Sequence, residues 1–227
     1  MAVILRNLKL SLLLLLSLFL ASWASSSGKV PPICHRVECT PYDVIYVGDG
    51  YEIRHYNSNV WVSTPFIKDT SFVEATRTGF GWIFDYVQGK NDYKQKIEMT
   101  APIVTEVAPC YGGLCVSIFE VNFYMPKKNH ANPPPTSDLV VGRSKPVYAA
   151  ARKVSGYVRD FNIGEEAAAL KASIAGTEWL YAIEKSNRSG YGSVYCVAQY
   201  NNPFEYESKV NEVYFLFDDL ENGSHSI

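Results

Sequence analysis

Histidine is scarce in this sequence, and the motifs of the common hydrolases and cofactor enzymes are missing. The chain has four histidines in 227 residues. It contains no Gly-x-Ser-x-Gly, no phosphate-binding glycine loop, no His-Glu-x-x-His and no Cys-x-x-Cys-His. Covalent haem attachment is therefore excluded, and a hydrolytic triad is not expected.

Long apolar runs are also missing, except at the start of the chain. Arg6 and Lys9 precede a leucine-rich run from Leu10 to Leu20, and small residues follow up to Ala24. This order predicts a secretory signal peptide over residues 1–24. A membrane anchor is the alternative, but the run of about 12 residues is shorter than the roughly 20 that span a bilayer. We therefore expect cleavage after Ala24 and no later transmembrane span.

An excess of positive charge is absent as well. Cleavage would remove two of the 21 basic residues and none of the 23 acidic ones, which leaves a formal charge of −4. A nucleic-acid partner is therefore not expected. About 200 residues remain, enough to bury one substantial core. The sequence does not indicate an oligomeric state.

The cysteines number only five, and all follow the signal peptide. Four of them form two short-range pairs, Cys34 with Cys39 and Cys110 with Cys115, and disulfides are the usual outcome in the secretory route. Zinc is the competing interpretation of Cys-x4-Cys, but a closed site needs four ligands and only His35 is near either pair. Cys196 is left over on an apolar strand face and is expected to be a buried thiol.

Secretion agrees with two glycosylation sequons, which begin at Asn187 and Asn222. The chain carries no ER-retention tetrapeptide. The expected destination is the extracellular space, the apoplast or the vacuole.

The first half of the chain predicts strands around one helix. Ser71 and Glu74 form a capping box, apolar positions continue to Val87, and Gly89 stands where a C-terminal glycine cap belongs. Residues 25–50 form a lead-in tied by the first cysteine pair. Strands are expected at 42–48, 51–64, 96–107 and 115–125.

The second half repeats this order after a proline-rich loop. Asn162 and Glu165 predict the start of a second helix, which continues to Ile174 and closes at Gly176. Strands are expected at 146–156, 178–185, 191–201 and 211–219. We therefore predict an α+β fold with two pseudo-repeats, about 51–126 and 146–217, and a polar tail over 218–227.

Two features of the first half indicate a place for a small molecule. In the strand at 51–64, His55 alternates with Tyr51 and Ile53 on the apolar face, opposite Glu52, Arg54 and Tyr56. The helix carries two stripes, of which one must pack on the sheet and the other forms a platform for a flat ligand or packs under the proline-rich loop. The stripes are Val73, Phe80, Phe84 and Val87, and Ala75, Gly79, Trp82 and Tyr86.

Several motifs resemble one family. "YEIRHYNSNVWVST", "TGFGWIFDYVQGKN", "KIEMTAPIVTEV", "VNFYMPKKNHANPPPTSD" and "VAQYNNPFEYESKVNEVYFLF" are similar to the SOUL, or haem-binding protein, family, most closely to its plant members with a signal peptide. The match covers roughly residues 40 to 217, within which we place a domain over 51–217.

The resemblance implies duplicated βαββ units that form a distorted, twisted β-barrel flanked by two α-helices. It also implies non-covalent, reversible binding of haem or protoporphyrin IX by a carrier, buffer or sensor, with no established catalytic step. The ligand would lie on the apolar patch of Ala75, Gly79, Trp82 and Tyr86, and His55 stands where an axial iron ligand has been proposed.

The chain departs from the family at Trp82, where relatives often carry a cation that pairs with a haem propionate. Arg77, Lys90 or Lys94 would have to replace that charge. Stacking of Trp82 on the porphyrin would compensate in part, because aromatic pairs contribute about 0.5–1.5 kcal/mol beyond area burial.

Two other functions are compatible with the sequence. A small-molecule hydrolase or effector-binding domain would use the cleft between the two halves, with Glu98, Glu120 or Tyr124 as the first candidates. A protein-interaction module would use the aromatic face of the helix instead, and no motif separates that role from a haem platform.

Overall fold

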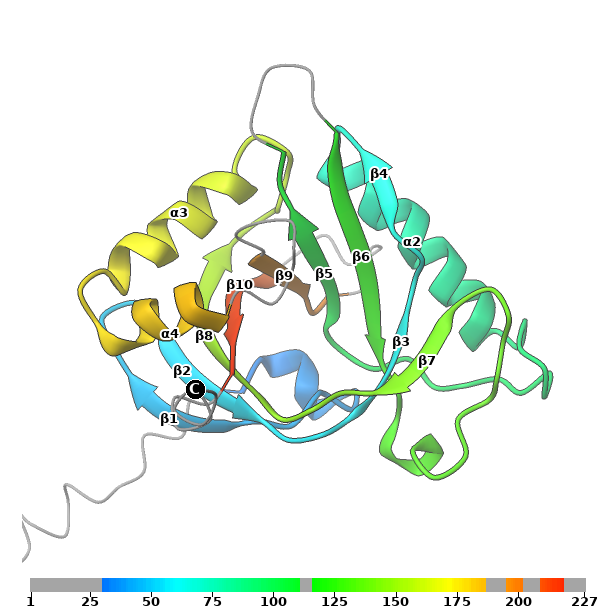
Figure 1. Ribbon diagram of the computed structural model, residues 1–227. Coiled ribbons are helices and arrows are strands. Elements are labelled where there is room, and N and C mark those ends of the chain that lie inside the picture. The colour runs from blue at the N-terminus through cyan, green and yellow to red at the C-terminus, as the bar shows by residue number, and fades with distance from the viewer. Residues whose placement is uncertain (1–29, 111–115, 187–194, 202–208, 219–227) are drawn as a thin grey trace, which may run out of the picture.

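One curled antiparallel sheet dominates the protein. The computed structural model describes residues 30–110, 116–186, 195–201 and 209–218 (Figure 1). Within these residues the sheet has ten strands in the order β1-β2-β8-β10-β9-β5-β6-β3-β7, with β4 paired to β6. Its bounds are β1 Asp43–Val47, β2 Glu52–Tyr56, β3 Val60–Ser63, β4 Ile67–Asp69, β5 Ile103–Ala108, β6 Ser117–Tyr124, β7 Val140–Arg143, β8 Val147–Ser155, β9 Tyr195–Gln199 and β10 Val210–Phe217.

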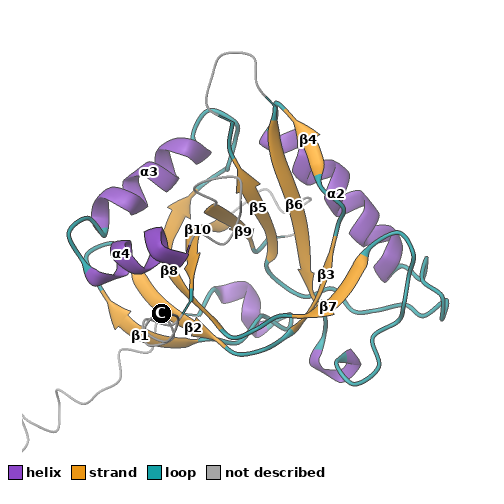
Figure 2. Cartoon of the chain, viewed as in Figure 1, coloured by secondary structure: helices purple, strands orange, loops and turns teal. Residues whose placement is uncertain are grey.

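The helices lie along the outer side of this half-barrel (Figure 2). These outer helices are α2 (Phe72–Val87), α3 (Ile163–Ser173) and α4 (Glu178–Ser186). Two short 3-10 helices lie elsewhere in the chain, η1 (Pro32–His35) and η2 (Lys127–Asn129). Helix α2 contacts β4 and β6, whereas α3 and α4 contact β10, and α3 also contacts β8. Each half of the sheet therefore has its own helical cover.

The strand order confirms the predicted duplication. The segment β3-β4-α2-β5-β6 is followed in sequence, after η2 and β7, by β8-α3-α4-β9-β10. Without β4, the first segment has the same strand–helix–strand–strand order as the second. In space these units give the sheet order β8-β10-β9 and then β5-β6-β3, which is the same order read from opposite ends. The two halves meet where β5 and β9 pair, from Ile103 opposite Gln199 to Val107 opposite Tyr195.

One predicted strand is a helix. Residues 178–185, expected to be extended, lie in α4. Trp179, Ala182 and Ile183 pack on the core, whereas Tyr181 is 64% exposed, which is the spacing of a helix rather than an alternating strand. The described residues therefore contain three α-helices, whereas two were predicted.

The two predicted helix caps had different outcomes. The hydroxyl of Ser71 accepts a hydrogen bond from the backbone N–H of Glu74 at 3.1 Å, and Gly89 has φ +108°, so α2 begins and ends where predicted. The second half of the predicted capping box is not formed, because the backbone N–H of Ser71 donates to Asp69 and not to Glu74. Asn162 makes no cap, because its side-chain oxygen accepts from the backbone N–H of Arg159 instead.

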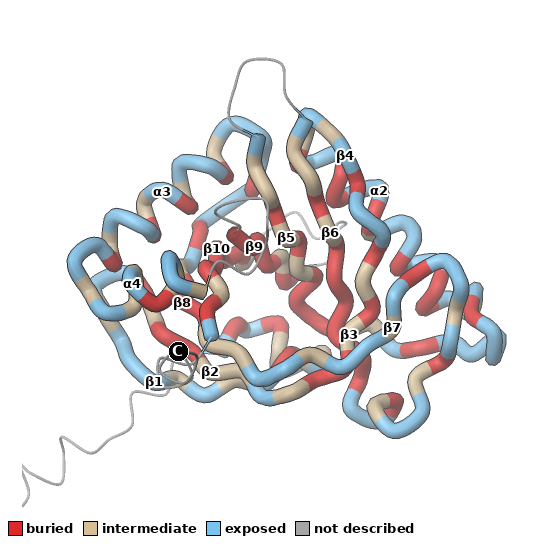
Figure 3. The backbone as a smooth tube through the Cα atoms, viewed as in Figure 1, coloured by how far each residue is buried: buried red, intermediate tan, exposed pale blue. Residues whose placement is uncertain are grey.

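Side chains alternate between two faces of the sheet, and both faces are covered. On β6, Phe119, Val121 and Phe123 point to the helices and form the main core with them. The inner face carries a second apolar cluster, in which Ile33 of η1 packs with Ala149 and Tyr214. Figure 3 shows the resulting buried positions along the central strands.

The lead-in closes part of the inner face. Cys34 and Cys39 form the predicted disulfide, with S–S 2.02 Å, and Cys39 bridges to Ala101. Cys196 is buried on the same face, as predicted.

Several predictions lie outside the described residues. They concern Cys115, Asn187, Asn222, the signal peptide at 1–24 and most of the tail. Among the described helices none is long and apolar enough to cross a membrane.

Candidate functional site

Helix α2 turns three of the four residues of the expected ligand platform toward the sheet. Ala75, Gly79 and Tyr86 are buried, and Trp82 is 42% exposed. A Cβ atom on Gly79 would lie 2.4 Å from Cγ2 of Val121, so only glycine permits this approach to β6. The hydroxyl of Tyr86 donates to the carbonyl of Pro134 at 2.6 Å. Of the two readings that the sequence left open for this stripe, packing on the sheet and under the proline-rich loop describes Ala75, Gly79 and Tyr86.

The other stripe is partly exposed: Val87 is buried in the core and Phe80 packs partly against it, whereas Val73 and Phe84 reach the surface. Val73, Arg77, Phe80 and Phe84 follow one another at helical spacing along one side of α2, and we call these four residues the α2 strip. Val73 and Phe84 are 39% and 43% exposed, and the rings of Phe80 and Phe84 stack with centroids 6.0 Å apart. The guanidinium of Arg77 is paired with Glu74 and remains 72% exposed. An exposed apolar strip with a cation beside it can hold a flat amphiphile that carries carboxylates.

His55 lies in the other half of the molecule. It is half-buried on β2, where its ring packs on Tyr148 with centroids 4.8 Å apart. Four strands separate β2 from β6, the strand under α2. At the usual strand spacing this is about 24 Å along the sheet. The structure therefore does not bring His55 and the α2 residues into one site.

The inner face of the sheet contains a pocket between the two halves. Its volume is about 220 Å³, and Glu106 and Glu120 stand opposite each other on its wall, in register across β5 and β6. The remaining wall is mainly apolar and aromatic and includes Tyr56, Trp61, Val104, Tyr200, Tyr214 and Leu216.

Only one of the three side chains that the sequence suggested for a cleft lines this pocket. Glu120 does so. Glu98 is exposed at the surface and pairs with Lys128 at 2.8 Å, and the hydroxyl of Tyr124 donates to Glu38 at 3.4 Å. Burial, and then the nearby Glu106, raise the pKa of Glu120 to about 7.

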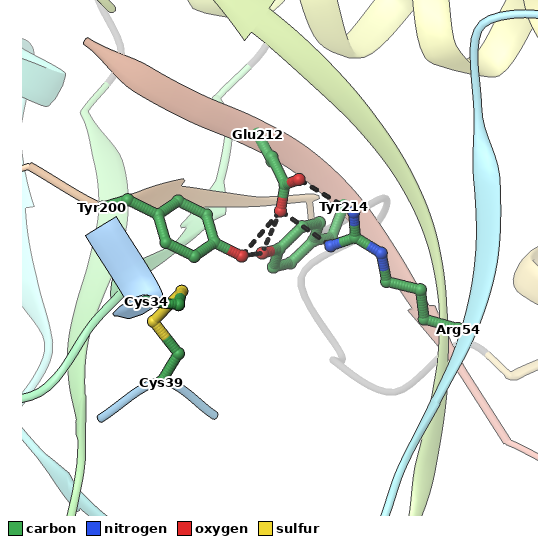
Figure 4. Close-up of a disulfide and its surroundings, with 6 residues drawn as sticks. All are labelled: Cys34, Cys39, Arg54, Tyr200, Glu212 and Tyr214. Carbon is green, nitrogen blue, oxygen red and sulfur yellow. Dashed lines mark hydrogen bonds and ion pairs between the residues drawn. A yellow bond between two sulfur atoms is a disulfide. The ribbon is translucent and has the colours of Figure 1, made fainter. Parts of the chain in front are cut away.

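Beneath the pocket lies an ion pair that sequence reasoning missed. Arg54 makes two hydrogen bonds to the carboxylate of Glu212, at 2.7 and 2.8 Å, and its guanidinium lies 4.2 Å from the ring centroid of Tyr42. Tyr200 and Tyr214 each donate to Glu212 at 2.8 Å (Figure 4). Arg54 had been expected on the more polar, less buried face of its strand, but it is 1% exposed.

The raised pKa of Glu120 predicts that Glu120→Gln increases the free energy of unfolding, by an amount that depends on pH. The folded protein holds this proton up to about pH 7, so wild-type stability falls as pH rises from the ordinary carboxyl pKa of about 4.5 to about 7 and then levels off. We expect Glu120→Gln to leave the free energy of unfolding unchanged at about pH 5 and to raise it by about 2 kcal/mol at about pH 8, after discounting for partial exposure. Urea unfolding at both pH values measures the difference, with Glu98→Gln as the exposed control. A gain that is the same at both pH values would contradict the assignment.

The family model and the curated relatives that match this chain agree on one family. The family model of the SOUL heme-binding protein matches residues 37–216. Heme-binding protein 2 of Homo sapiens is 32% identical over 169 residues, covering 74% of this chain and 78% of the relative. Heme-binding protein 1 of Sus scrofa is 27% identical over 186 residues, covering 79% and 93%. A solved structure, SAV2435 bound to tetraphenylphosphonium, aligns at 13% identity and a TM-score of 0.42 over 77% of this chain and 98% of that one, which is too low to support an argument. From the length of the family match and the identity to these relatives, the chain belongs to the SOUL heme-binding protein family.

Proposed function

We propose that this protein binds haem and related tetrapyrroles such as protoporphyrin IX non-covalently and reversibly, on the α2 strip. The observation that carries the proposal is the exposed apolar side of α2, with the stacked Phe80 and Phe84 and the accessible guanidinium of Arg77. A porphyrin face would cover the rings, and Arg77 would exchange Glu74 for a propionate. The proposal fits a carrier, buffer or sensor, and the family membership favours binding over catalysis.

The inner pocket is a poor alternative for a tetrapyrrole. Its walls carry Glu106 and Glu120, which would repel the propionates. Its volume of about 220 Å³ is also below the roughly 300–1,000 Å³ of pockets for drug-sized ligands. The outer surface of α2 has neither obstacle.

We further propose that His55 does not ligate the iron of a haem bound on α2, because of the separation along the sheet described above. Loss of hemin binding in His55→Ala, with protoporphyrin IX binding kept, would instead make His55 an axial ligand and move the site to β2.

Titration of the disulfide-intact protein with hemin and with protoporphyrin IX, followed by the Soret band, tests the site. We expect saturable binding of both, weakened about tenfold or more by Phe84→Ser, since burial of a phenylalanine side chain contributes about 1.5–3 kcal/mol. Arg77→Gln should weaken it less. The matched control is Tyr181→Ser, an exposed aromatic on α4, which should change nothing. Absence of saturable binding would refute the proposal, and equal losses in Phe84→Ser and Tyr181→Ser would refute the site.

Secretion is part of the same proposal and rests on the sequence alone. The signal peptide at 1–24 and the sequons at Asn187 and Asn222 predict a glycosylated protein in the extracellular space, the apoplast or the vacuole. N-terminal sequencing of the expressed protein, with a start at residue 25, would support this. A start at Met1 would contradict it.

A further inference from the structure

The wall of the inner pocket follows the register of the strands. Glu120 stands opposite Glu106 across β6 and β5, and two residues further along each strand Asn122 stands opposite Val104. All four residues line the pocket, so they point to the same face of the sheet. The two glutamates therefore form one end of this wall, and Val104 and Asn122 form its middle.

Aromatic rings form the other end of the pocket. Tyr124 lies two residues beyond Asn122 on β6, and its partner on β3 is Trp61, which lines the pocket. Tyr200 lines it as well, directly after the end of β9. Four residues of an antiparallel strand span about 13 Å, which is the distance along the sheet from Glu120 to the row of Trp61. The pocket therefore runs from a carboxylate end to an aromatic end.

The carboxylate of Glu120 lacks a hydrogen-bond donor. Its side chain is half-buried on the pocket wall, and within the part of the chain that the structure describes no N–H or O–H donates to it. An ionised carboxylate only accepts hydrogen bonds, and its burial is unfavourable where no donor is present. Burial accordingly raises the pKa of this carboxyl group. A ligand with an N–H or O–H group would supply the donor at this end of the pocket.

The rest of the lining defines the body of such a ligand. Val104 and Leu216 supply apolar surface, and Tyr56, Trp61 and Tyr214 supply aromatic rings, against which a flat ring system can pack. The volume of about 220 Å³ is larger than the apolar cavity of about 150 Å³ that binds a single benzene ring. Two fused rings would therefore fit, whereas a tetrapyrrole would not.

We propose that the inner pocket binds a flat aromatic molecule of two fused rings, of the indole or naphthol type, which donates a hydrogen bond to Glu120. The rings would lie over Val104 and Asn122 and extend toward Trp61. This site is separate from the α2 strip, because the pocket residues of β6 alternate with Phe119, Val121 and Phe123, which face the helices. The proposal therefore adds a second ligand to the proposed haem-binding function and does not depend on it.

Two isomeric methylindoles test the hydrogen bond. 1-Methylindole and 3-methylindole have the same size and nearly the same apolar surface, but only 3-methylindole keeps its N–H. Titration calorimetry of the disulfide-intact protein at about pH 8, where Glu120 is ionised, should show about tenfold tighter binding of 3-methylindole, because hydrogen bonds to charged groups are among the stronger ones. Equal affinities of the two isomers, or no binding of either, would overturn the proposal.

Variants of Glu120 locate the acceptor. Glu120→Leu should make the two isomers bind equally, whereas Glu120→Gln should keep part of the preference, because its amide oxygen still accepts a hydrogen bond. Glu98→Gln, which changes an exposed carboxylate outside the pocket, should keep the full preference. A merely structural effect would weaken both isomers alike, so the ratio of the two affinities is the readout. An unchanged ratio in Glu120→Leu would overturn the assignment of Glu120.

Phe84→Ser separates this site from the α2 strip. The variant should weaken hemin binding, as expected above, and leave the affinity for 3-methylindole unchanged. Loss of 3-methylindole binding in Phe84→Ser would place the indole on α2 and overturn the pocket as its site. Failure of hemin to bind would refute the proposed haem function alone, since the two methylindoles are measured without haem.

Discussion

Arg54→Met is expected to lower the free energy of unfolding by about 3–5 kcal/mol, the usual cost of removing one partner from a buried ion pair. Glu212 is fully buried, and in the variant its carboxylate would keep only the hydrogen bonds from Tyr200 and Tyr214. Methionine preserves most of the side-chain volume, so the loss reports the uncompensated charge and not a cavity. Chemical denaturation at about pH 7 measures it.

Two further variants separate the buried charge from other causes. Arg54→Met with Glu212→Leu should recover the part of the loss that the buried charge of Glu212 causes, because replacing buried charges by apolar side chains is often neutral. Glu52, which also pairs with Arg54 at 2.9 Å and is 16% exposed, keeps its charge in this variant. Arg77→Met breaks the exposed pair with Glu74 and should change stability by less than about 0.5 kcal/mol. If the double variant were as unstable as Arg54→Met, packing and not charge would explain the effect.

The same pair predicts acid sensitivity. Burial alone would raise the pKa of Glu212, but hydrogen bonds and charge from Arg54, with hydrogen bonds from the two tyrosines, hold it below the ordinary value. A lowered carboxyl pKa contributes stability that is present above the unfolded value and is lost as pH falls through the folded one. In acid, where Glu212 is protonated, Arg54→Met should therefore lower the free energy of unfolding much less than it does at about pH 7.

Gly79→Leu is expected to destabilise the protein by about 3 kcal/mol, at the upper end of overpacking effects. Atoms added at this position meet Val121 at 2.4 Å and then Ile67 at 3.1 Å, both on strands under the helix. Helix propensity works in the opposite direction, since leucine is favoured over glycine by about 0.8 kcal/mol. Thermal or urea unfolding would give the net value.

The chain offers a control two residues away. A Cβ on Gly81 meets nothing within 4 Å, so Gly81→Leu should be neutral or stabilising by up to about 0.8 kcal/mol. Adding Val121→Ala to Gly79→Leu should recover part of the loss. Equal effects at the two glycines would show that backbone propensity, and not the approach of α2 to β6, sets the result.

Much of the fold was predictable because local signals agreed with tertiary packing. Ser71, Val87 and Gly89 indicated the ends of α2, and alternation identified the core face of β6, with Phe119, Val121 and Phe123. Alternation did not identify the faces of β2, where Arg54 is buried and His55 is half-buried. The stretch that forms α4 failed because Trp179, Tyr181 and Ile183 satisfy a strand pattern as well as Trp179, Ala182 and Ile183 satisfy a helical one.

The candidate site was less predictable, since it depends on residues far apart in sequence. Arg54 and Glu212 are separated by 158 positions, and nothing local indicates that their strands flank β8. The sequence did offer one signal, which is the single acidic residue Glu212 within the otherwise uncharged strand β10. Helical periodicity cannot show which stripe of α2 faces the sheet. That depends on the position of Val121 on β6, which lies far away in the sequence.

The lead-in that covers part of the inner face packs on residues that come much later in the sequence. The segment around Ile33 and the Cys34–Cys39 loop packs in a cluster with Ala149, Ala151, Tyr200 and Tyr214. During synthesis the loop is made first, but its docking surface is complete only when β9 and β10 have emerged. A chain shortened before β9 would keep the two cysteines of that loop and lose part of the surface on which it packs, namely Tyr200 and Tyr214.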